Sequence, residues 1–277
     1  MQWKRFWKRF CRNKTAVAGL GIILALVVGA AFAPLLAPYP PDKINLRNAC
    51  KGPSAAHLLG TDMLGRDILS RVLFGARISM YLSFTSVLAS LIIGGALGLI
   101  AGYYRGFINH VITWFTDLAL SFPSFLLALA IVSFLGPGLS NLLFALVISS
   151  VPRFTRVVKG TVLIIKESDY VNAARAIGAS SLRIMLRTIL PNSFAPALVQ
   201  ATIRIAEVVL IASGLGFLGL GVQPPTPEWG LMVSEGRFLL RVAPHIVAVP
   251  GCAIALFALG FNLLGDGLRD ALDVEMA

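Results

Sequence analysis

The sequence predicts an all-α integral membrane protein with six transmembrane helices. Hydrophobic residues make up 57% of the 277 residues, charged residues make up 13%, and the mean hydropathy is +0.81. Soluble domains carry about 25% charged residues, so a chain with half that share cannot cover a water-exposed surface. Six apolar runs are long enough to cross about 30 Å of hydrocarbon: residues 15–37, 78–102, 111–135, 139–158, 194–221 and 244–265.

The distribution of basic residues predicts the orientation of these helices. The chain has 24 Lys and Arg residues and a net charge of +11; six of the 24 lie within the first fourteen positions and seven lie between Arg153 and Arg187. Cytoplasmic loops of membrane proteins are enriched in Lys and Arg. With both termini in the cytoplasm, fifteen basic residues fall on the cytoplasmic side and eight fall outside. The pattern favours membrane lipid over nucleic acid as the partner of this charge.

Three segments outside the apolar runs complete the predicted layout. Residues 1–14 alternate basic and aromatic residues, which is typical of a cytoplasmic amphipathic helix on the membrane surface; an irregular basic tail is the alternative. Residues 38–77 are predicted to be extracytoplasmic and to end in a short amphipathic helix, in which Asp67 and Arg71 form an i, i+4 pair. Residues 222–243 begin with several prolines and are predicted to turn at the outer surface as a lip or re-entrant segment.

The most informative polar segment is 166–192, between the fourth and fifth apolar runs. It contains two short amphipathic patterns separated by Gly178. A glycine permits the left-handed backbone of a sharp reversal between two helices. We expect the two apolar stripes to form one docking surface for a partner, with a loop on the lipid surface as the alternative. The stripes are Tyr170, Ala173, Ala174 and Ile177, then Leu182, Met185, Leu186 and Ile189.

The sequence contains no recognisable catalytic motif. No GxxxxGK[ST], HExxH or GxSxG pattern occurs, and the three cysteines show no metal-binding spacing. We therefore expect no catalytic residue, no metal site and no cofactor in this chain. Charged residues inside apolar runs are candidates for a transport pathway. They are Asp117, Arg204 and Glu207, of which the last two are three positions apart and are expected to neutralise each other.

Four stretches resemble one family of transport proteins. Asn172-Ala173-Ala174, then Gly178, then Ile189-Leu190-Pro191 are similar to the EAA loop of binding-protein-dependent ABC importer permeases. The other three resemble the C-type, or second, transmembrane subunit of the dipeptide/oligopeptide/nickel branch of that family. They are LGTDMLGRDILSRVLFGARIS (59–79), GFLGLGVQPPTPEWG (216–230) and FNLLGDGLRDALD (261–273), and with the apolar runs they cover nearly the whole chain.

The resemblance implies the type I ABC importer permease fold, with a core permease domain at 78–266, a coupling loop at 166–192 and a cytoplasmic tail at 267–277. It implies a heterodimer with a homologous permease subunit, two ATPase subunits that bind ATP and Mg²⁺, and an extracytoplasmic substrate-binding protein. The implied location is the cytoplasmic (inner) membrane of a bacterium or archaeon. The implied coupling residues are Asn172, Ala173, Ala174, Gly178, Arg183, Arg187, Leu190 and Pro191.

One position departs from the family pattern, because Asn172 stands where the family usually has glutamate. A salt bridge from this position to an ATPase is not expected. The candidates for polar contact with the ATPase are instead Arg175, Arg183 and Arg187.

Two other classes of function remain compatible with the residues. An ion-coupled secondary transporter is the first, although such carriers are expected to show more isolated charges and paired repeats; a membrane-embedded enzyme is the second. For the importer, the expected substrate is a di- or oligopeptide, with nickel, a metal chelate or glutathione as alternatives, since specificity in this family lies largely in the binding protein.

Overall fold

The computed structural model describes residues 10–273, and within this range the regular secondary structure is helical apart from an isolated β-bridge between Thr61 and Asp67. Five of the described helices are long and apolar enough to cross a membrane, and a bent pair makes a sixth when counted as one span. This confirms the predicted all-α membrane fold. The five are α2 (Lys14–Ala31), α4 (Ile68–Tyr103), α7 (Leu139–Ile165), α11 (Phe194–Phe217) and α13 (His245–Asp273); the pair is α5 (Phe107–Leu120) and α6 (Ser124–Leu135).

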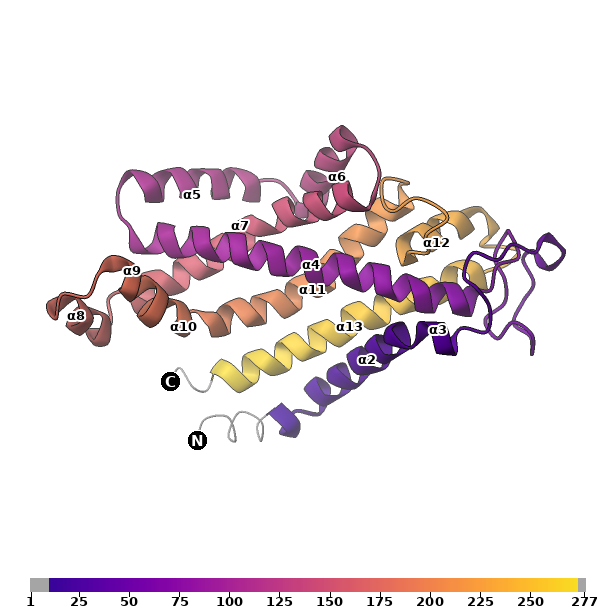
Figure 1. Ribbon diagram of the computed structural model, residues 1–277, viewed down its shortest axis with the longest axis horizontal. Coiled ribbons are helices and arrows are strands. Elements are labelled where there is room, and N and C mark those ends of the chain that lie inside the picture. Colours follow the sequence, from indigo (N-terminus) through magenta and orange to yellow (C-terminus); the bar gives the residue numbers. More distant parts are fainter. Residues whose placement is uncertain (1–9, 274–277) are drawn as a thin grey trace.

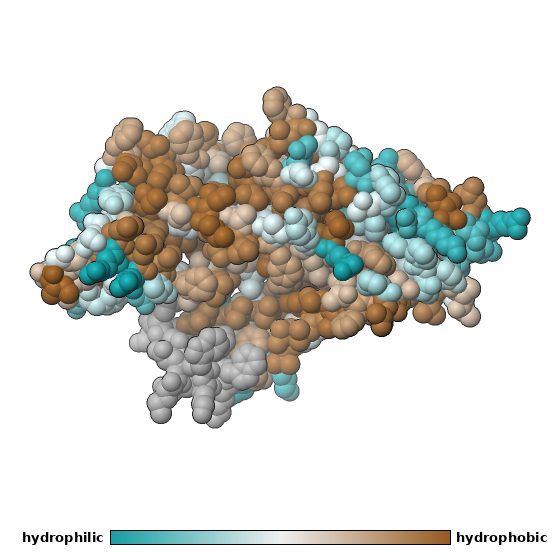
Figure 2. Space-filling model, viewed as in Figure 1, coloured by the Kyte–Doolittle hydropathy of each residue, from teal (hydrophilic) through white to brown (hydrophobic). Residues whose placement is uncertain are grey.

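Shorter helices lie at the two ends of the bundle (Figure 1). The end that we call the loop end carries α8 (Asp169–Ala176), α9 (Ser181–Arg183), the π-helical turn η2 (Ile184–Ile189) and α10 (Leu190–Asn192). The opposite, distal end carries α3 (Ala33–Leu36), η1 (Leu46–Asn48), α12 (Trp229–Gly236) and η3 (Arg237–Leu239). Figure 2 shows hydrophilic residues gathered at both ends and a mostly hydrophobic middle. This is the distribution expected of a bundle that crosses a bilayer along its long axis.

The predicted third span, 111–135, is not one continuous helix. Helices α5 and α6 meet at an angle of 91° across a short break that contains Pro123. Proline lacks an amide hydrogen, and its ring disfavours the α conformation of the preceding residue, so a helix ends there. Helix α5 packs beside α4 and α7, and α6 packs on α7 (Figure 1).

The predicted boundary at residue 78 is also absent, because α4 runs without interruption from Ile68 to Tyr103. Its 36 residues span about 54 Å at 1.5 Å per residue. Asp67 caps the helix, since its carboxylate accepts a hydrogen bond from the Ser70 backbone N–H at 2.8 Å. No proline lies within this stretch to stop the helix. The amphipathic helix and the second span predicted from the sequence are therefore one helix.

Glycines on one face of α4 allow a close approach of α7, and these two helices make the largest helix–helix contact among the described residues. A Cβ atom added at Gly94 or at Gly98 would lie 2.6 Å from a backbone oxygen of α7. A Cβ at the neighbouring Gly95 would meet no atom within 4 Å. The small-residue face therefore sets the distance between the two helices.

The two described ends of the chain lie side by side near the loop end (Figure 1). Helix α2 packs on α13, and the Asn13 side-chain amide donates to the Asp270 carboxylate at 3.1 Å. Helix α13 continues to Asp273, past the predicted end of the last span at 265. The amphipathic helix predicted over 1–14 falls mostly on residues 1–9, and the end of the predicted tail falls on 274–277; both lie outside the described residues.

Candidate functional site: a docking loop and a charged cluster at membrane depth

The loop segment, residues 166–192, folds as two short helical stretches joined by a reversal at Gly178. Helix α8 ends just before this glycine, whose φ of +78° is in the left-handed region. The Ala179 N–H donates to the Ala174 carbonyl at 3.1 Å and closes the turn. A Cβ atom at Gly178 would meet no atom within 4 Å. The backbone conformation, and not crowding, is therefore what favours glycine here.

Apolar side chains attach the loop segment to the ends of the spanning helices. Val171 from α8 and Ile184, Met185 and Ile189 from η2 are buried in one cluster with residues of α4, α7 and α11, namely Leu99, Val158, Val162 and Ala197. The loop segment is therefore packed against three spanning helices at once.

A buried lysine adds a polar attachment at the same place. Lys166 follows the last residue of α7, and its Nζ donates to the Gly102 carbonyl near the end of α4 at 2.7 Å. Burial lowers the pKa of Lys166, and the nearby positive charge of Arg105 lowers it further. This hydrogen bond joins the ends of α4 and α7 at the start of the loop segment.

The outer surface of the loop segment exposes several apolar side chains among charged and polar ones. The first predicted stripe faces outward: Ile177 is 85% exposed, Tyr170 and Ala173 are exposed, and Ala174 is half-buried. An exposed apolar face at the end of a membrane bundle is typical of a docking surface.

The second predicted stripe does not stay together. Met185 and Ile189 point into the core, whereas Leu182 and Leu186 are 62% and 49% exposed. The π-helical turn at Ile184–Ile189 changes the angular spacing of these residues. The exposed half of the stripe still adds to the outer apolar surface, next to the exposed Leu190 and Pro191.

The polar residues of the loop segment divide into two groups. The Asn172 side-chain oxygen accepts from Arg175 Nη1 at 3.2 Å, and the Arg175 guanidinium lies 5.9 Å from the centre of the Tyr103 ring. Arg183 and Arg187 are exposed and make no ion pair with any described residue. Of the three candidate arginines, these two remain available to a partner, while Arg175 is engaged within the chain.

A second polar site lies on α7 and α11, deep within the spans. Arg204 Nη1 donates to Glu207 Oε2 at 2.6 Å, which is the ion pair expected from the sequence. The structure adds Arg153 of α7, whose Nη1 lies 2.8 and 2.9 Å from the two oxygens of the same carboxylate. One glutamate is therefore shared by two arginines, and the cluster has a net charge of +1.

The third charged residue expected within the spans lies elsewhere. Asp117 of α5 pairs with Arg156 of α7 at 2.6 Å, and both side chains are more than half exposed. Together with Lys159 they line a groove between α5 and α7. Its partner Arg156 lies three positions, or about one helical turn, after Arg153 on α7. The structure does not bring Asp117 into the cluster of Arg153 and Glu207.

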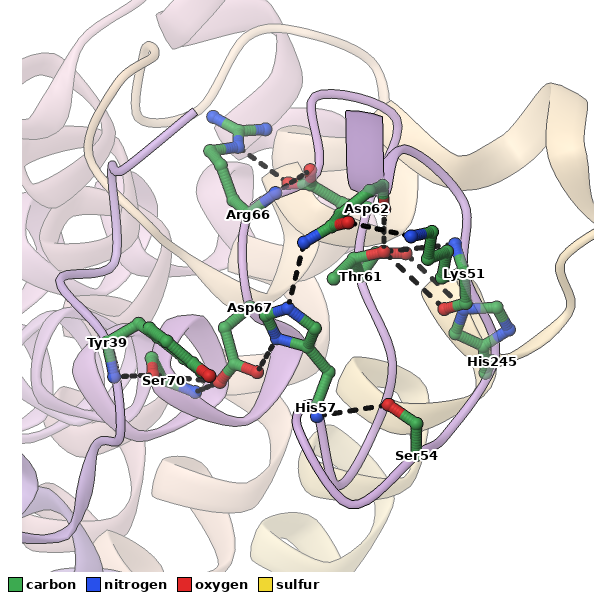
Figure 3. A network of polar contacts seen from close by, with 11 residues as sticks. Tyr39, Lys51, Ser54, His57, Thr61, Asp62, Arg66, Asp67, Ser70 and His245 are labelled. Carbon is green, nitrogen blue, oxygen red and sulfur yellow. Dashed lines mark hydrogen bonds and ion pairs between the residues drawn. The ribbon is translucent and has the colours of Figure 1, made fainter. Parts of the chain in front are cut away.

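At the distal end, a buried polar network holds residues 38–67 against α4 (Figure 3). His57 Nδ1 lies 2.9 Å from the Asp67 carboxylate, which also accepts from the Ser70 hydroxyl at 2.8 Å. The Ser70 hydroxyl in turn accepts from the Tyr39 backbone N–H at 3.2 Å. This segment is therefore an ordered structure built on the start of α4.

The same network corrects the predicted Asp67–Arg71 pair. Arg71 Nη2 instead donates to Glu235 of α12 at 2.9 Å, and Arg66 donates to the same Glu235 oxygen at 2.9 Å and to Asp62 at 2.6 Å. Asp67 is occupied as the cap of α4, so its carboxylate faces His57 and Ser70 and not the next helical turn.

The predicted re-entrant segment folds back on the bundle as α12. Its cap Glu228 is buried, and the carboxylate accepts from the backbone N–H groups of Gly230 and Leu231 at 2.9 Å and from the Ser79 hydroxyl at 3.0 Å. Burial raises the pKa of Glu228. Trp229 is fully buried, and its ring N–H donates to the Val72 carbonyl at 3.1 Å. The segment is therefore an integral part of the distal end.

Sequence reasoning did not find several of these polar residues, chiefly Arg153, Asp62 and Glu235. Arg153 and Glu207 are 54 positions apart, and Arg71 and Glu235 are 164 apart. No local spacing links such pairs. The available signal was the position of Arg153 inside the apolar run of α7.

A polytopic helical bundle with a glycine-hinged docking loop at one end is the architecture of an ABC importer permease. The fold matches a solved structure of the MetNI methionine ABC transporter in an inward-facing conformation, with a TM-score of 0.60 and 18% sequence identity; the match covers 73% of this chain and 96% of that one. At this identity the likeness concerns the fold alone.

The chain belongs to the family of binding-protein-dependent transport system inner membrane components, whose family model matches residues 94–277. Residues 1–53 match the N-terminal transmembrane domain of oligopeptide transport permease C. The chain is thus a multi-pass inner-membrane permease subunit. This confirms the resemblance drawn from the four sequence stretches.

Curated relatives are similar over nearly the full chain. The dipeptide transport system permease protein DppC of Alkalihalophilus pseudofirmus is 48% identical over 99% of this chain and 90% of its own length. The glutathione transport system permease protein GsiD of Pectobacterium atrosepticum is 45% identical over 99% and 91%. The di/tripeptide transport system permease protein DppC of Pseudomonas aeruginosa is 46% identical over 99% and 92%.

Proposed function

We propose that this chain forms half of the translocation pathway of an ATP-driven importer for di- and oligopeptides. Its partners are a homologous permease subunit, two ATPase subunits that bind ATP and Mg²⁺, and an extracytoplasmic substrate-binding protein. The observation that carries the proposal is the loop segment, because an exposed apolar surface with two unpaired arginines is attached to the ends of three spanning helices. The proposed coupling residues are those expected from the sequence, with Arg183 and Arg187 as the polar contacts.

The proposed orientation places the loop end and both termini in the cytoplasm. Of the fifteen basic residues assigned to the cytoplasmic side from the sequence, all but Arg153, which lies within α7, are then placed toward that side, as the positive-inside rule requires. The contact between Asn13 and Asp270 supports an even number of crossings, since it brings the two described chain ends together. The distal end, with residues 38–67 and α12, then faces the binding protein.

In the proposed mechanism, ATP closes the partner ATPase dimer and moves the two docked loop segments toward each other. The loop segment transmits this movement to α4, α7 and α11 through the Val171 cluster and Lys166. These helices tilt and the pathway alternates between inward-facing and outward-facing states. The chain itself binds the substrate, guides it across the membrane and changes conformation, while its ATPase partners hydrolyse ATP.

Peptides are the substrates that we propose, because two of the relatives are named for di- or tripeptides and glutathione is itself a tripeptide. Nickel and metal chelates are the alternatives within the same architecture. An ion-coupled carrier is the alternative of another class, and it requires no ATPase.

The test is uptake by the complete complex reconstituted in lipid vesicles with its binding protein. We expect accumulation of a radiolabelled dipeptide that depends on ATP and on the binding protein, and ATPase subunits that co-purify with this chain. Uptake driven by an ion gradient without ATP would contradict the proposal. Uptake of ⁶³Ni²⁺ in place of the peptide would instead assign the metal alternative.

A further inference from the structure

The Arg153–Glu207–Arg204 cluster lies near the middle of the two helices that carry it. At 1.5 Å per residue, Arg153 is about 21 Å from the start of α7 at Leu139 and about 18 Å from its end at Ile165. Glu207 is about 20 Å from Phe194 and about 15 Å from Phe217 on α11. Both bounding helices are apolar enough to span the membrane. The cluster is therefore at membrane depth, remote from both polar ends.

The two arginines of the cluster have different surroundings. The side chain of Arg204 is 1% exposed, and its guanidinium donates to the Ser150 hydroxyl, the Ser149 carbonyl and the Glu207 carboxylate. The side chain of Arg153 is 39% exposed. Its only recorded hydrogen bonds within the described chain are those from Nη1 to Glu207. Arg204 is thus a satisfied structural partner, whereas Arg153 presents the rest of its guanidinium to the surface.

The exposed side of Arg153 and Glu207 does not suit contact with lipid. Charged groups at the bilayer centre are costly, and they face the bundle interior or a water-filled cavity. Since this chain forms half of a pathway in the proposed function, the side of α7 and α11 that carries these two residues is the side toward that pathway. One glutamate shared by two arginines leaves a positive charge there.

We propose that Arg153 contacts the C-terminal carboxylate of the peptide as it passes through the membrane, with Glu207 as the residue that positions it. This inference rests on the proposed function. A guanidinium presents parallel N–H donors that match the two oxygens of a carboxylate. Glu207 holds Nη1 and leaves Nη2 and Nε as the two donors for the ligand. It also offsets part of the positive charge, so that the carboxylate is attracted but still released, as conduction through a pore requires.

Arg153 can be replaced without leaving another charge of the cluster unpaired. In Arg153→Gln, Glu207 retains Arg204 at 2.6 Å, so no unpaired charge is created and the cluster becomes neutral. In Arg153→Lys the positive charge is kept, although the fork of donors is lost. Assembly of each variant is checked by co-purification with the partner permease and the ATPase subunits.

The experiment compares uptake of a dipeptide and of the same dipeptide amidated at its C-terminus, in the reconstituted complex. We expect Arg153→Gln to lower uptake of the free acid by about tenfold, the loss expected for one charge-assisted hydrogen bond, and to leave uptake of the amide unchanged. Arg153→Lys keeps the charge but not the paired donors, so its uptake of the acid should fall between that of the wild type and that of Arg153→Gln. A preference of the binding protein for one of the two substrates does not affect the result, because each substrate is compared between variant and wild type with the same binding protein.

Three outcomes would overturn the inference. Equal losses for acid and amide would show that Arg153 serves only packing or assembly. Equal uptake of the acid by Arg153→Lys and Arg153→Gln would show that its charge is irrelevant. If the wild-type complex imported neither form of the peptide, the proposed function itself would be wrong. The role of Arg153 toward a peptide would then be wrong as well.

Discussion

At the scale of single residues, two positions of this chain favour glycine for different physical reasons. Gly178 has open space around it and a φ of +78°, so the backbone favours glycine there. Gly98 has an ordinary helical backbone and no space for a side chain. The intramembrane charges show a similar contrast, since Arg204 is buried and satisfied while Arg153 is half-exposed. Surroundings, and not residue type, decide what each side chain does.

Gly178→Val is expected to reduce substrate-stimulated ATP hydrolysis and uptake by at least about tenfold while the permease still assembles. A left-handed backbone costs a non-glycine residue about 1–2 kcal/mol, so the reversal that presents the docking surface is lost. Ala173→Asp should act similarly by placing a charge in an apolar contact. Gly178→Asn is the matched control, because asparagine tolerates this conformation, and Asn172→Ala should change little. Wild-type coupling in Gly178→Val would reduce the loop segment to an ordinary surface loop.

The ion pairs of Glu207 give a second prediction at this scale. Glu207→Ala leaves Arg204 buried without its counter-charge, and the amount of assembled permease in the membrane is expected to fall by about threefold or more. The double change Arg204→Ala with Glu207→Ala removes the buried stranded charge and leaves only the half-exposed Arg153 without its partner, so it should assemble better than Glu207→Ala. Immunoblots of membrane fractions and co-purified partner measure this. Equal damage from single and double changes would instead give Glu207 a direct role in the pathway.

At the scale of helices, contact between α4 and α7 organises the bundle. The glycine face of α4 meets the backbone of α7, and the ends of the same two helices are joined by Lys166 to Gly102. Because α7 also carries Arg153 and leads into the loop segment, this contact links the proposed docking surface to the charged cluster.

Gly98→Ala is expected to destabilise the permease, since the added Cβ would lie 2.6 Å from the Thr155 carbonyl oxygen. Overpacking of this kind costs about 1–3 kcal/mol. Gly95→Ala is the control on the same helix, because its Cβ meets no atom within 4 Å; it should be neutral or slightly stabilising. Thermal unfolding of the purified complex in detergent compares the two. Equal melting temperatures would show that α4 and α7 can separate without cost.

At the scale of the whole molecule, the two ends differ in how they are built. The distal end is held by buried ionic and hydrogen-bonded contacts between residues 38–67 and α4 (Figure 3), and by the ion pair of Arg71 with Glu235 of α12. The loop end is held by an apolar cluster and presents apolar residues outward. A distal end tied together by ionic contacts and an exposed surface packed on three spanning helices suit the proposed division of tasks between the two sides of the membrane.

The proposed orientation predicts which cysteines react with a membrane-impermeant thiol reagent. In cells whose outer barrier has been opened, Cys50 should be labelled in a chain with Cys11→Ser and Cys252→Ala. Ser180→Cys, placed in the same background with Cys50→Ser, should be labelled only after the inner membrane is permeabilised. Labelling of Ser180→Cys in intact inner membranes would show that the loop segment faces outward, contrary to the proposed orientation.

The sequence by itself determined the all-α membrane class, the glycine reversal at Gly178 and the family. These depend on local properties: apolar run length, helical periodicity and the backbone freedom of glycine. Only the tertiary structure decided that α5 and α6 meet at 91°, that Arg71 pairs with Glu235 and not with Asp67, and that Arg153 joins Glu207. The physical reason is that a charged side chain has several partners of suitable sign along the chain. Helix packing alone brings one of them within reach.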